Sequence, residues 1–133
     1  MWTTPKTDWR NSDFFNWSDY NRIKNNLNEL KTLADGIIPS FTFEDMGADI
    51  RSYEYIWDPQ DFNRIENNLH SIFKATGYGI SIGNKQTFGY NQKFIKYDEL
   101  NRIERATLNL YNLLSAQNNG RRMLPFTLGG VEF

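Results

Sequence analysis

Residues 19–27 read Asp-Tyr-Asn-Arg-Ile-Lys-Asn-Asn-Leu, and residues 61–69 read Asp-Phe-Asn-Arg-Ile-Glu-Asn-Asn-Leu. Seven of the nine positions are identical, and the two differences exchange one aromatic ring for another and one charge for its opposite. A weaker third copy, Glu-Leu-Asn-Arg-Ile-Glu-Arg-Ala-Thr, occupies residues 99–107. The shared Asn-Arg-Ile begins at residues 21, 63 and 101, which are 42 and 38 residues apart in a chain of 133. This spacing predicts three copies of one structural unit.

Each copy opens a stretch with the periodicity of an amphipathic helix. Apolar residues recur three and four positions apart, which places them on one face of a helix. The three apolar stripes are Tyr20, Ile23, Leu27, Leu30 and Ala34, then Phe62, Ile65, Leu69, Ile72 and Phe73, then Leu100, Ile103, Leu110, Leu113 and Leu114. The sequence therefore predicts helices at about 19–35, 59–75 and 98–118.

Residues that favour helix ends flank these stretches. Short polar side chains are expected to cap the three starts, and they are Ser18, Asp58 (followed by Pro59 at the first helical position) and Asp98. Glycines are expected to close the three ends in the left-handed conformation, and they are Gly36, Gly77 and Gly120.

The stretches between the helices have strand character. Short strands are expected within the connections at 41–43, 53–57, 80–82, 87–88 and 94–95. The fold class predicted is mainly α with minor β, in which three repeated amphipathic helices are joined by long loops containing short strands. The domain organisation predicted is an aromatic N-terminal arm at 1–17, a three-repeat helical domain at 18–120 with units of about 18–57, 58–96 and 97–120, and a C-terminal tail at 121–133 that could dock as a strand.

Composition excludes several classes of function. The chain has no cysteine and one histidine, His70, which rules out disulfides, zinc–thiolate sites and any multi-histidine metal site within one chain. Its net charge of −1 offers no field for neutralising phosphates, so nucleic acid is not an expected partner. No signal peptide or apolar run long enough to cross a bilayer is visible, and we expect a soluble chain made in the cytoplasm without membrane contact.

An acid precedes each repeated arginine by three residues, as Asp19/Arg22, Asp61/Arg64 and Glu99/Arg102. At helical spacing these are same-face pairs with the acid in the first turn, and an exposed pair of this kind contributes a few tenths of a kcal/mol. One interpretation is that the arginines and asparagines bond loop backbone or a neighbouring subunit. The other is that duplication of a workable helix start carried them along. Either way, the repeat favours a scaffold over an active site.

Tryptophans cluster just before the first two repeats. Trp2, Trp9 and Trp17 approach the first, and Trp57 approaches the second. Flat rings stack on sugars and anchor protein interfaces. The competing interpretation, which the positions of Trp17 and Trp57 favour, is that these rings close over the helix starts. The four tryptophans, with Arg22, Arg64 and Arg102, are the candidate interface or sugar-stacking residues.

Enzyme chemistry finds little support in the sequence. Glu44, Asp45 and Asp49 form an acidic cluster that lacks both the spacing of a calcium loop and a defined pair of glycosidase acids. No phosphate loop, nucleophile elbow or dinucleotide fingerprint appears. His70 is expected at the surface. We therefore expect no enzyme, with no catalytic, cofactor-binding or metal-binding residues.

Residues 5–9 (Pro-Lys-Thr-Asp-Trp), 13–16 (Asp-Phe-Phe-Asn) and 19–26 form an ordered string. This string resembles a signature of minor structural proteins from the tail, baseplate or fibre region of phages and prophages of Gram-positive bacteria. Residues 126–130 (Phe-Thr-Leu-Gly-Gly) are also similar to the ends of some phage tail proteins. The resemblance implies a component of the virion, made in the host cytoplasm, that bridges other proteins or serves attachment to the host. It carries over no catalytic residue.

The leading functional hypothesis is thus a non-enzymatic phage tail or baseplate protein, acting through protein–protein contacts in assembly or host attachment. Expected partners are other phage tail proteins, and virion symmetry favours a homo-oligomer. The alternative is a carbohydrate-binding module that recognises host cell-wall polysaccharide through Trp2, Trp9, Trp17 or Trp57. A small hydrolase is a third hypothesis, tested by loss of turnover in Asp45→Asn.

Overall fold

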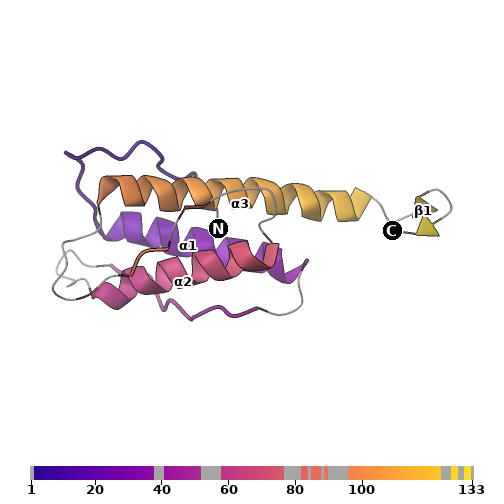
Figure 1. The fold of residues 1–133 in the computed structure, drawn as a ribbon, viewed down its shortest axis with the longest axis horizontal. Helices are drawn as coiled ribbons and strands as arrows, with labels where there is room; N and C mark the ends of the chain where they lie inside the picture. Colours follow the sequence, from indigo (N-terminus) through magenta and orange to yellow (C-terminus); the bar gives the residue numbers. More distant parts are fainter. Residues whose placement is uncertain are drawn as a thin grey trace.

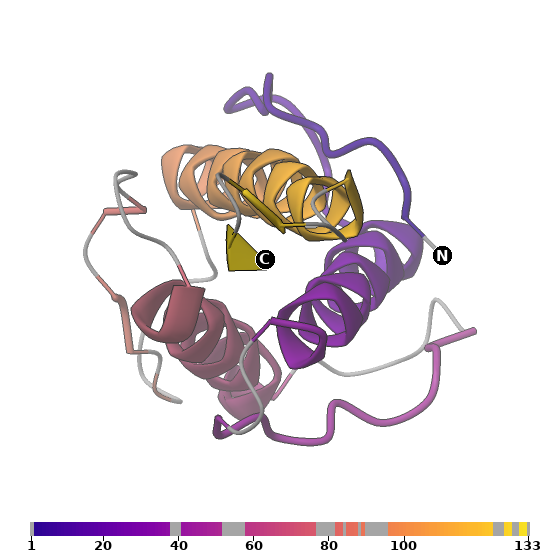
Figure 2. The same cartoon turned by 90° about the vertical axis from the view of Figure 1, so that its right-hand side faces the viewer.

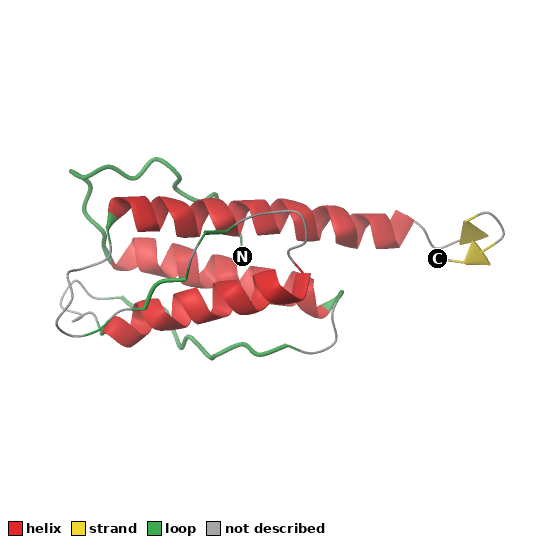
Figure 3. Cartoon of the chain, viewed as in Figure 1, coloured by secondary structure: helices red, strands yellow, loops and turns green. Residues whose placement is uncertain are grey.

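Three helices dominate the computed structural model, as predicted from the sequence (Figure 1; Figure 3). They are α1 (Trp17–Asp35), α2 (Pro59–Thr76) and α3 (Tyr97–Met123), followed by two short strands, β1 (Thr127–Leu128) and β2 (Val131–Glu132). The structure describes residues 2–37, 41–51, 58–76, 82–83, 85–87, 89, 96–123, 127–128 and 131–132. No helix within these residues is long and apolar enough to span a membrane.

The three helices run in the same direction, and each packs against the other two (Figure 1; Figure 2). Parallel neighbours require each connection to return along the length of the bundle. A helix of 19 residues is about 28 Å long, and about nine extended residues cover that distance. Connections of about 20 residues are therefore long enough for parallel packing of these helices.

Extended segments cover the outside of the bundle (Figure 2). We call residues 2–10 strap 1, residues 41–51 strap 2, and the described residues between 82 and 89 strap 3. Each strap bonds to a different pair of helices: strap 1 to α1 and α3, strap 2 to α1 and α2, and strap 3 to α2 and α3. The bundle is thus enclosed by one strap for every pair of helices.

The core is one apolar cluster inside the triangle of helices. Every residue of the predicted stripes is buried except Phe73 and Leu113, which are half-buried. Each strap adds one buried side chain to the helical core, and these are Trp9, Met46 and Ile82. Thr107, which interrupts the third stripe, is also buried, and its hydroxyl donates to the carbonyl of Ile103 at 2.7 Å. Burial of the stripes is the main source of stability expected for such a bundle.

The helix starts differ in part from the predicted ones. Asn16, not Ser18, caps α1, because its side chain accepts from the backbone of Ser18 and Asp19 while Asp19 bonds back to Asn16. Asp58 caps α2 as predicted, accepting from the N–H of Gln60 at 2.8 Å. Asp98 lies inside the first turn of α3, which begins one residue earlier.

The helix ends also depart from prediction. Gly36 follows α1 with φ of −73°, so the end is right-handed. Gly120 lies within α3, which continues to Met123. Gly77 falls outside the described residues. Among the described residues, the left-handed glycines are instead Gly47 and Gly83, both with φ of 77°, one in each of straps 2 and 3.

The expected loop strands are not found among the described residues. Residues 41–43 are extended but pair with no strand, and the same holds for the described parts of 80–82 and 87–88. The expected strands at 53–57 and 94–95 lie outside the described residues. The reason is that the straps find their hydrogen bonds on helix side chains. In the tail, β1 pairs antiparallel with β2, and this hairpin lies beyond the end of α3 (Figure 1).

Candidate functional site

The repeated asparagines bind the straps. Each carboxamide bonds both backbone groups of a single strap residue: its oxygen accepts from the N–H, and its nitrogen donates to the carbonyl. The four pairs, with these two distances, are Asn26 to Thr3 (2.8 and 2.7 Å), Asn101 to Trp9 (2.7 and 3.0 Å), Asn68 to Glu44 (2.7 and 2.9 Å) and Asn21 to Ile50 (2.9 and 2.7 Å). An asparagine side chain offers one acceptor and a donor in the geometry of a peptide group, so it substitutes for a neighbouring strand.

These asparagine bonds solve a problem that the straps create. An extended segment against a helix has no strand partner for its backbone, and a buried unpaired backbone group costs about as much as a lost hydrogen bond. Asn21 and Asn101 occupy the same position in the first and third copies of the repeat, and Asn26 and Asn68 share a position in the first and second. The repeated asparagines therefore hold loop backbone within the subunit, which is one of the two uses that the sequence left open.

Glu104 is the centre of a buried polar cluster between α1, α3 and strap 1. Its side chain is 1% exposed and takes both Nε and Nη2 of Arg22 at 2.8 and 2.6 Å. It also accepts from the indole Nε1 of Trp9 at 2.6 Å and from the N–H of Lys6 at 3.0 Å. Four N–H groups thus converge on one carboxylate, which ties two helices and a strap together.

Glu66 plays the corresponding role between α2, α3 and strap 3. It is fully buried and bonded to Nη2 of Arg102, and it accepts from the N–H of Gln86 at 3.3 Å. Burial raises the pKa of the Glu66 carboxyl, against the opposing effect of the Arg102 guanidinium. Arg102 also donates to the carbonyl of Ile82 in strap 3.

His70 lies one helical turn after Glu66 and is only 23% exposed, with its Nε2 3.7 Å from the Glu66 carboxylate. His70 is therefore half-buried, where the sequence predicted a surface position. Burial, together with the charges of Arg102 and Lys85, lowers the pKa of the imidazole. His70 is thus a largely neutral side chain packed beside a buried carboxylate.

The three arginines of the candidate set divide into two kinds. All three form the predicted pair with the acid three residues earlier, at 2.9 Å for Arg22, 2.8 Å for Arg64 and 2.7 Å for Arg102. Arg22 and Arg102 are 16% exposed and bond across to other helices, so they act inside the subunit. Arg64 is 32% exposed and bonds only its own helix among the described residues.

The tryptophans do not form one platform. Trp9 is 4% exposed with its indole bonded to Glu104, which excludes it as an open stacking surface. Trp2 stacks on Tyr111 of α3, with ring centroids 3.8 Å apart and planes 9° from parallel. Trp17 is the half-buried first residue of α1, and Trp57 lies outside the described residues. The structure therefore brings Trp2 and Trp9 to the inner side of strap 1, where the sequence suggested exposed rings.

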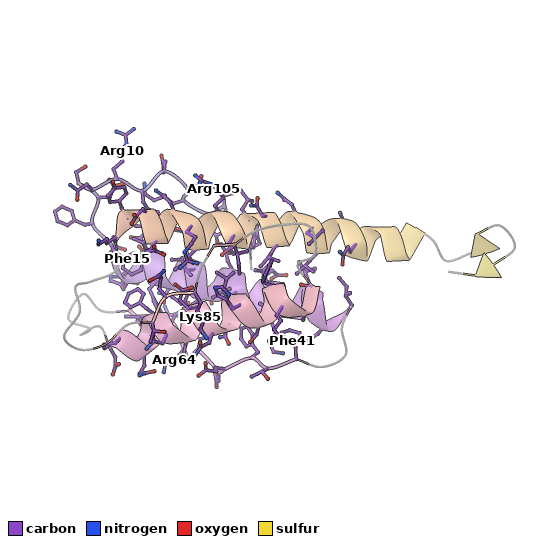
Figure 4. The ribbon with its side chains drawn as sticks, viewed as in Figure 1. Arg10, Phe15, Phe41, Arg64, Lys85 and Arg105 are labelled. Atoms are coloured by element: carbon purple, nitrogen blue, oxygen red, sulfur yellow. The ribbon has the colours of Figure 1, made fainter. Side chains whose placement is uncertain are left out.

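Exposed aromatic surface appears instead at the end of the bundle where the helices start. Phe14 is 89% exposed and Tyr97 is 45% exposed. Tyr97 and Phe15 line an open hollow of about 460 Å³ together with Lys96 and Asp13. Figure 4 places Phe15 at this end, beside the start of α3. The signal for Phe14 was present in the sequence, as an aromatic pair next to a helix cap.

The acidic cluster of strap 2 is dispersed. Asp49 pairs with Lys24, Glu44 accepts from Asn67 at 2.9 Å, and Asp45 accepts from the N–H of Gly47 at 2.8 Å. Lys24 and neighbouring Asn25 lower the pKa of Asp49 through hydrogen bonds and charge. No group of three or more His, Asp or Glu side chains suited to a metal ion occurs in the part of the chain that the structure describes.

Comparison with protein-family models, with curated proteins and with solved structures finds no match to this chain.

Proposed function

We propose that this chain is a non-enzymatic structural protein of a phage tail or baseplate, which works by docking to other tail proteins. The observation that carries the proposal is the ordered string of residues 5–9, 13–16 and 19–26, which resembles the signature of such proteins. Within the string, Trp9 and Asn26 hold strap 1 to the helices, and Arg22 joins α1 to Glu104 of α3. A motif whose polar residues maintain the shape of the subunit suits a building block.

The surface available for docking is the end of the bundle that carries Phe14 and Tyr97. Large aromatic side chains are enriched at protein interfaces, and an exposed phenylalanine favours burial against a partner. The hollow beside Tyr97 offers a recess for a partner side chain. Placement in a virion and self-association through this end are parts of the same proposal.

We also propose that the copied unit is a strap followed by its helix. When each unit begins with its strap, the aromatic arm at 1–17 supplies the strap of the first unit. Each helix then has one strap that precedes it. The Asp-Trp-Arg of residues 8–10 in strap 1 then corresponds to the Asp-Ile-Arg of residues 49–51 in strap 2. Trp9 and Ile50 of these triplets bond Asn101 and Asn21, which are themselves corresponding residues.

The test is co-purification of the chain with co-expressed tail proteins, together with light scattering of the purified chain. The double variant Phe14→Ser/Tyr97→Ser is expected to abolish association, while Asn112→Ser, at an exposed position of α3, leaves it intact. A monomer that captures no tail protein would contradict the proposal. Binding of cell-wall polysaccharide by that monomer, lost in Trp17→Ala, would favour the carbohydrate-binding alternative.

A further inference from the structure

The ion pairs between helices repeat the same sequence positions from one pair of helices to the next. Arg22 of α1 bonds Glu104 of α3, and Arg102 of α3 bonds Glu66 of α2. Each of these glutamates stands two residues after the repeated arginine of its own helix. By the same rule, the third arginine, Arg64 of α2, would form an ion pair with the side chain two residues after Arg22 on α1.

That third position holds a cation. Lys24 occupies it, 3% exposed, and its ammonium group pairs with Asp49 and donates to the carbonyl of Gly47 at 3.2 Å. Among the described residues, Arg64 consequently lacks the carboxylate from a neighbouring helix that its two counterparts have. Its Nη2 bonds Asp61, and its buried Nε has no hydrogen-bond partner within the described structure. A buried N–H without an acceptor is a cost that a bound acceptor would remove.

A cavity lies where the missing carboxylate would enter. It has a volume of about 370 Å³, runs between the first halves of α1 and α2 and strap 2, and is lined by Arg64, Arg51 and Tyr20 among others. In the view of Figure 4, Arg64 lies on the side of α2 away from α3. Arg51 makes no hydrogen bond to a described residue, so two guanidinium groups with donor capacity line one cavity.

The charges at this cavity leave room for one anion. The cavity is lined by two cations, Arg51 and Arg64, and two acids, Asp49 and Asp61. Lys24, outside the lining, also pairs with Asp49, so among the described residues one positive charge has no counterpart. Both acids are already bonded, Asp49 by Lys24 and Asp61 by Arg64. A guanidinium group binds a planar carboxylate with two parallel N–H bonds, as Arg22 binds Glu104 here.

We propose that this cavity is a binding site for a single carboxylate group, held by Arg64 with Arg51. The ligand takes the place that Glu104 and Glu66 fill at the other two helix pairs. The volume of the cavity suits a small carboxylic acid or one acidic side chain of a docking protein. The site does not depend on the proposed virion role, because a free acid would occupy it equally well.

The direct test is NMR of the whole chain with the Nε–Hε signal of Arg64 as the probe. Titration with acetate is expected to shift this signal and the amides of Gly47 and Ala48 with a saturable curve, while chloride at equal ionic strength does not. A second arm uses a capped peptide with one glutamate and its glutamine counterpart. Tighter binding of the glutamate peptide than of acetate identifies a protein-borne carboxylate, and equal binding identifies a free acid. No saturable shift in either arm overturns the proposal.

Variants separate the site from general charge effects. Arg64→Gln is expected to abolish the acetate shift at Gly47, and Arg51→Gln, which breaks no described hydrogen bond, to weaken binding several-fold. Lys24→Glu supplies the missing carboxylate from within and is expected to block acetate. Lys31→Glu makes the same charge change on the same helix at a side chain 42% exposed, and should bind acetate within about twofold of the parent chain. Unchanged binding in both Lys24→Glu and Arg51→Gln would overturn the proposal, even if Arg64→Gln fails to fold.

Discussion

Replacing Glu104 by glutamine probes the cluster that joins two helices and a strap. The carboxylate accepts from four N–H groups, two on Arg22 and one each on Trp9 and Lys6. A glutamine keeps the size of the side chain but has one oxygen, which accepts about two of these bonds. Two donors then face an amide nitrogen, and Arg22 keeps only Asp19 as a charged partner.

The expected loss follows from those two donors. A buried donor left without an acceptor costs about 1–3 kcal/mol, and breaking a buried ion pair about 3–5 kcal/mol. Since Arg22 retains Asp19 and is 16% exposed, we expect Glu104→Gln to lower the free energy of unfolding by about 3 kcal/mol. For a chain of this size that is a fall in Tm of about 10 °C.

The assay is urea unfolding followed by tryptophan fluorescence, with the NMR signal of the Trp9 indole N–H as a local readout. Glu99→Gln is the matched control, because the Glu99 side chain is 28% exposed and, among the described residues, its carboxylate bonds only Arg102. A loss below about 1 kcal/mol is therefore expected. Equal losses in the two variants, with the Trp9 signal unmoved in Glu104→Gln, would refute the reasoning.

Three further predictions test other parts of the fold. Asn101→Ala should cost about 1–3 kcal/mol by urea unfolding because it strips the backbone of Trp9 of both partners, while Asn112→Ala at an exposed position of α3 should cost nothing measurable. Gly83→Ala should destabilise more than Gly47→Ala by Tm, since both glycines have φ of 77° but only the added Cβ at Gly83 meets Arg102, at 2.5 Å; equal effects would contradict that contact. The pKa of His70 is lowered in the folded chain, so as the pH falls the unfolded chain binds the proton first. The free energy of unfolding therefore decreases below pH 6.5, the ordinary pKa of histidine, by at most about 1.4 kcal/mol per pH unit. This loss should be absent from His70→Asn in unfolding measured at several pH values, and parallel pH curves for the two chains would contradict it.

The helices were predictable because their signal is local. Three apolar stripes at helical spacing gave the number of helices, the bounds of α1 and α2 to within two residues, and nearly the whole core. The predicted end of α3 is five residues early, because Gly120, a residue typical of helix ends, lies within the helix. A glycine costs a helix about 1 kcal/mol, and neighbouring residues override that cost.

The polar interior was predictable only in part. The pairs between an arginine and the acid three residues earlier follow from helical spacing alone, and all three are present. The bonds to Glu104 and Glu66 depend on the helices being parallel, which no local pattern reveals. A glutamate within a polar repeat is ordinarily expected to face solvent. Glu104 and Glu66 are buried because the helices pack in parallel, which the long connections allow.

The straps have the sequence pattern of strands but form no sheet, for a physical reason. Alternating aromatic and polar residues such as 41–43 satisfy the strand pattern, but a strand needs a backbone partner. Here the partners are asparagine side chains from the helices, so the same alternation produces an extended segment outside any sheet. The repeat itself held the clue, because it preserves asparagines that the apolar stripe does not require.

Hydrogen exchange of four backbone amides is the most direct measurement of whether the repeated asparagines hold the straps. The amides belong to Thr3, Trp9, Glu44 and Ile50, and each donates to a single asparagine side chain at 2.7 to 2.9 Å. We expect all four to be protected in the native chain, and Asn101→Ala to expose Trp9 while leaving Ile50 protected. Exchange of all four at the rate of an unstructured peptide would contradict this arrangement.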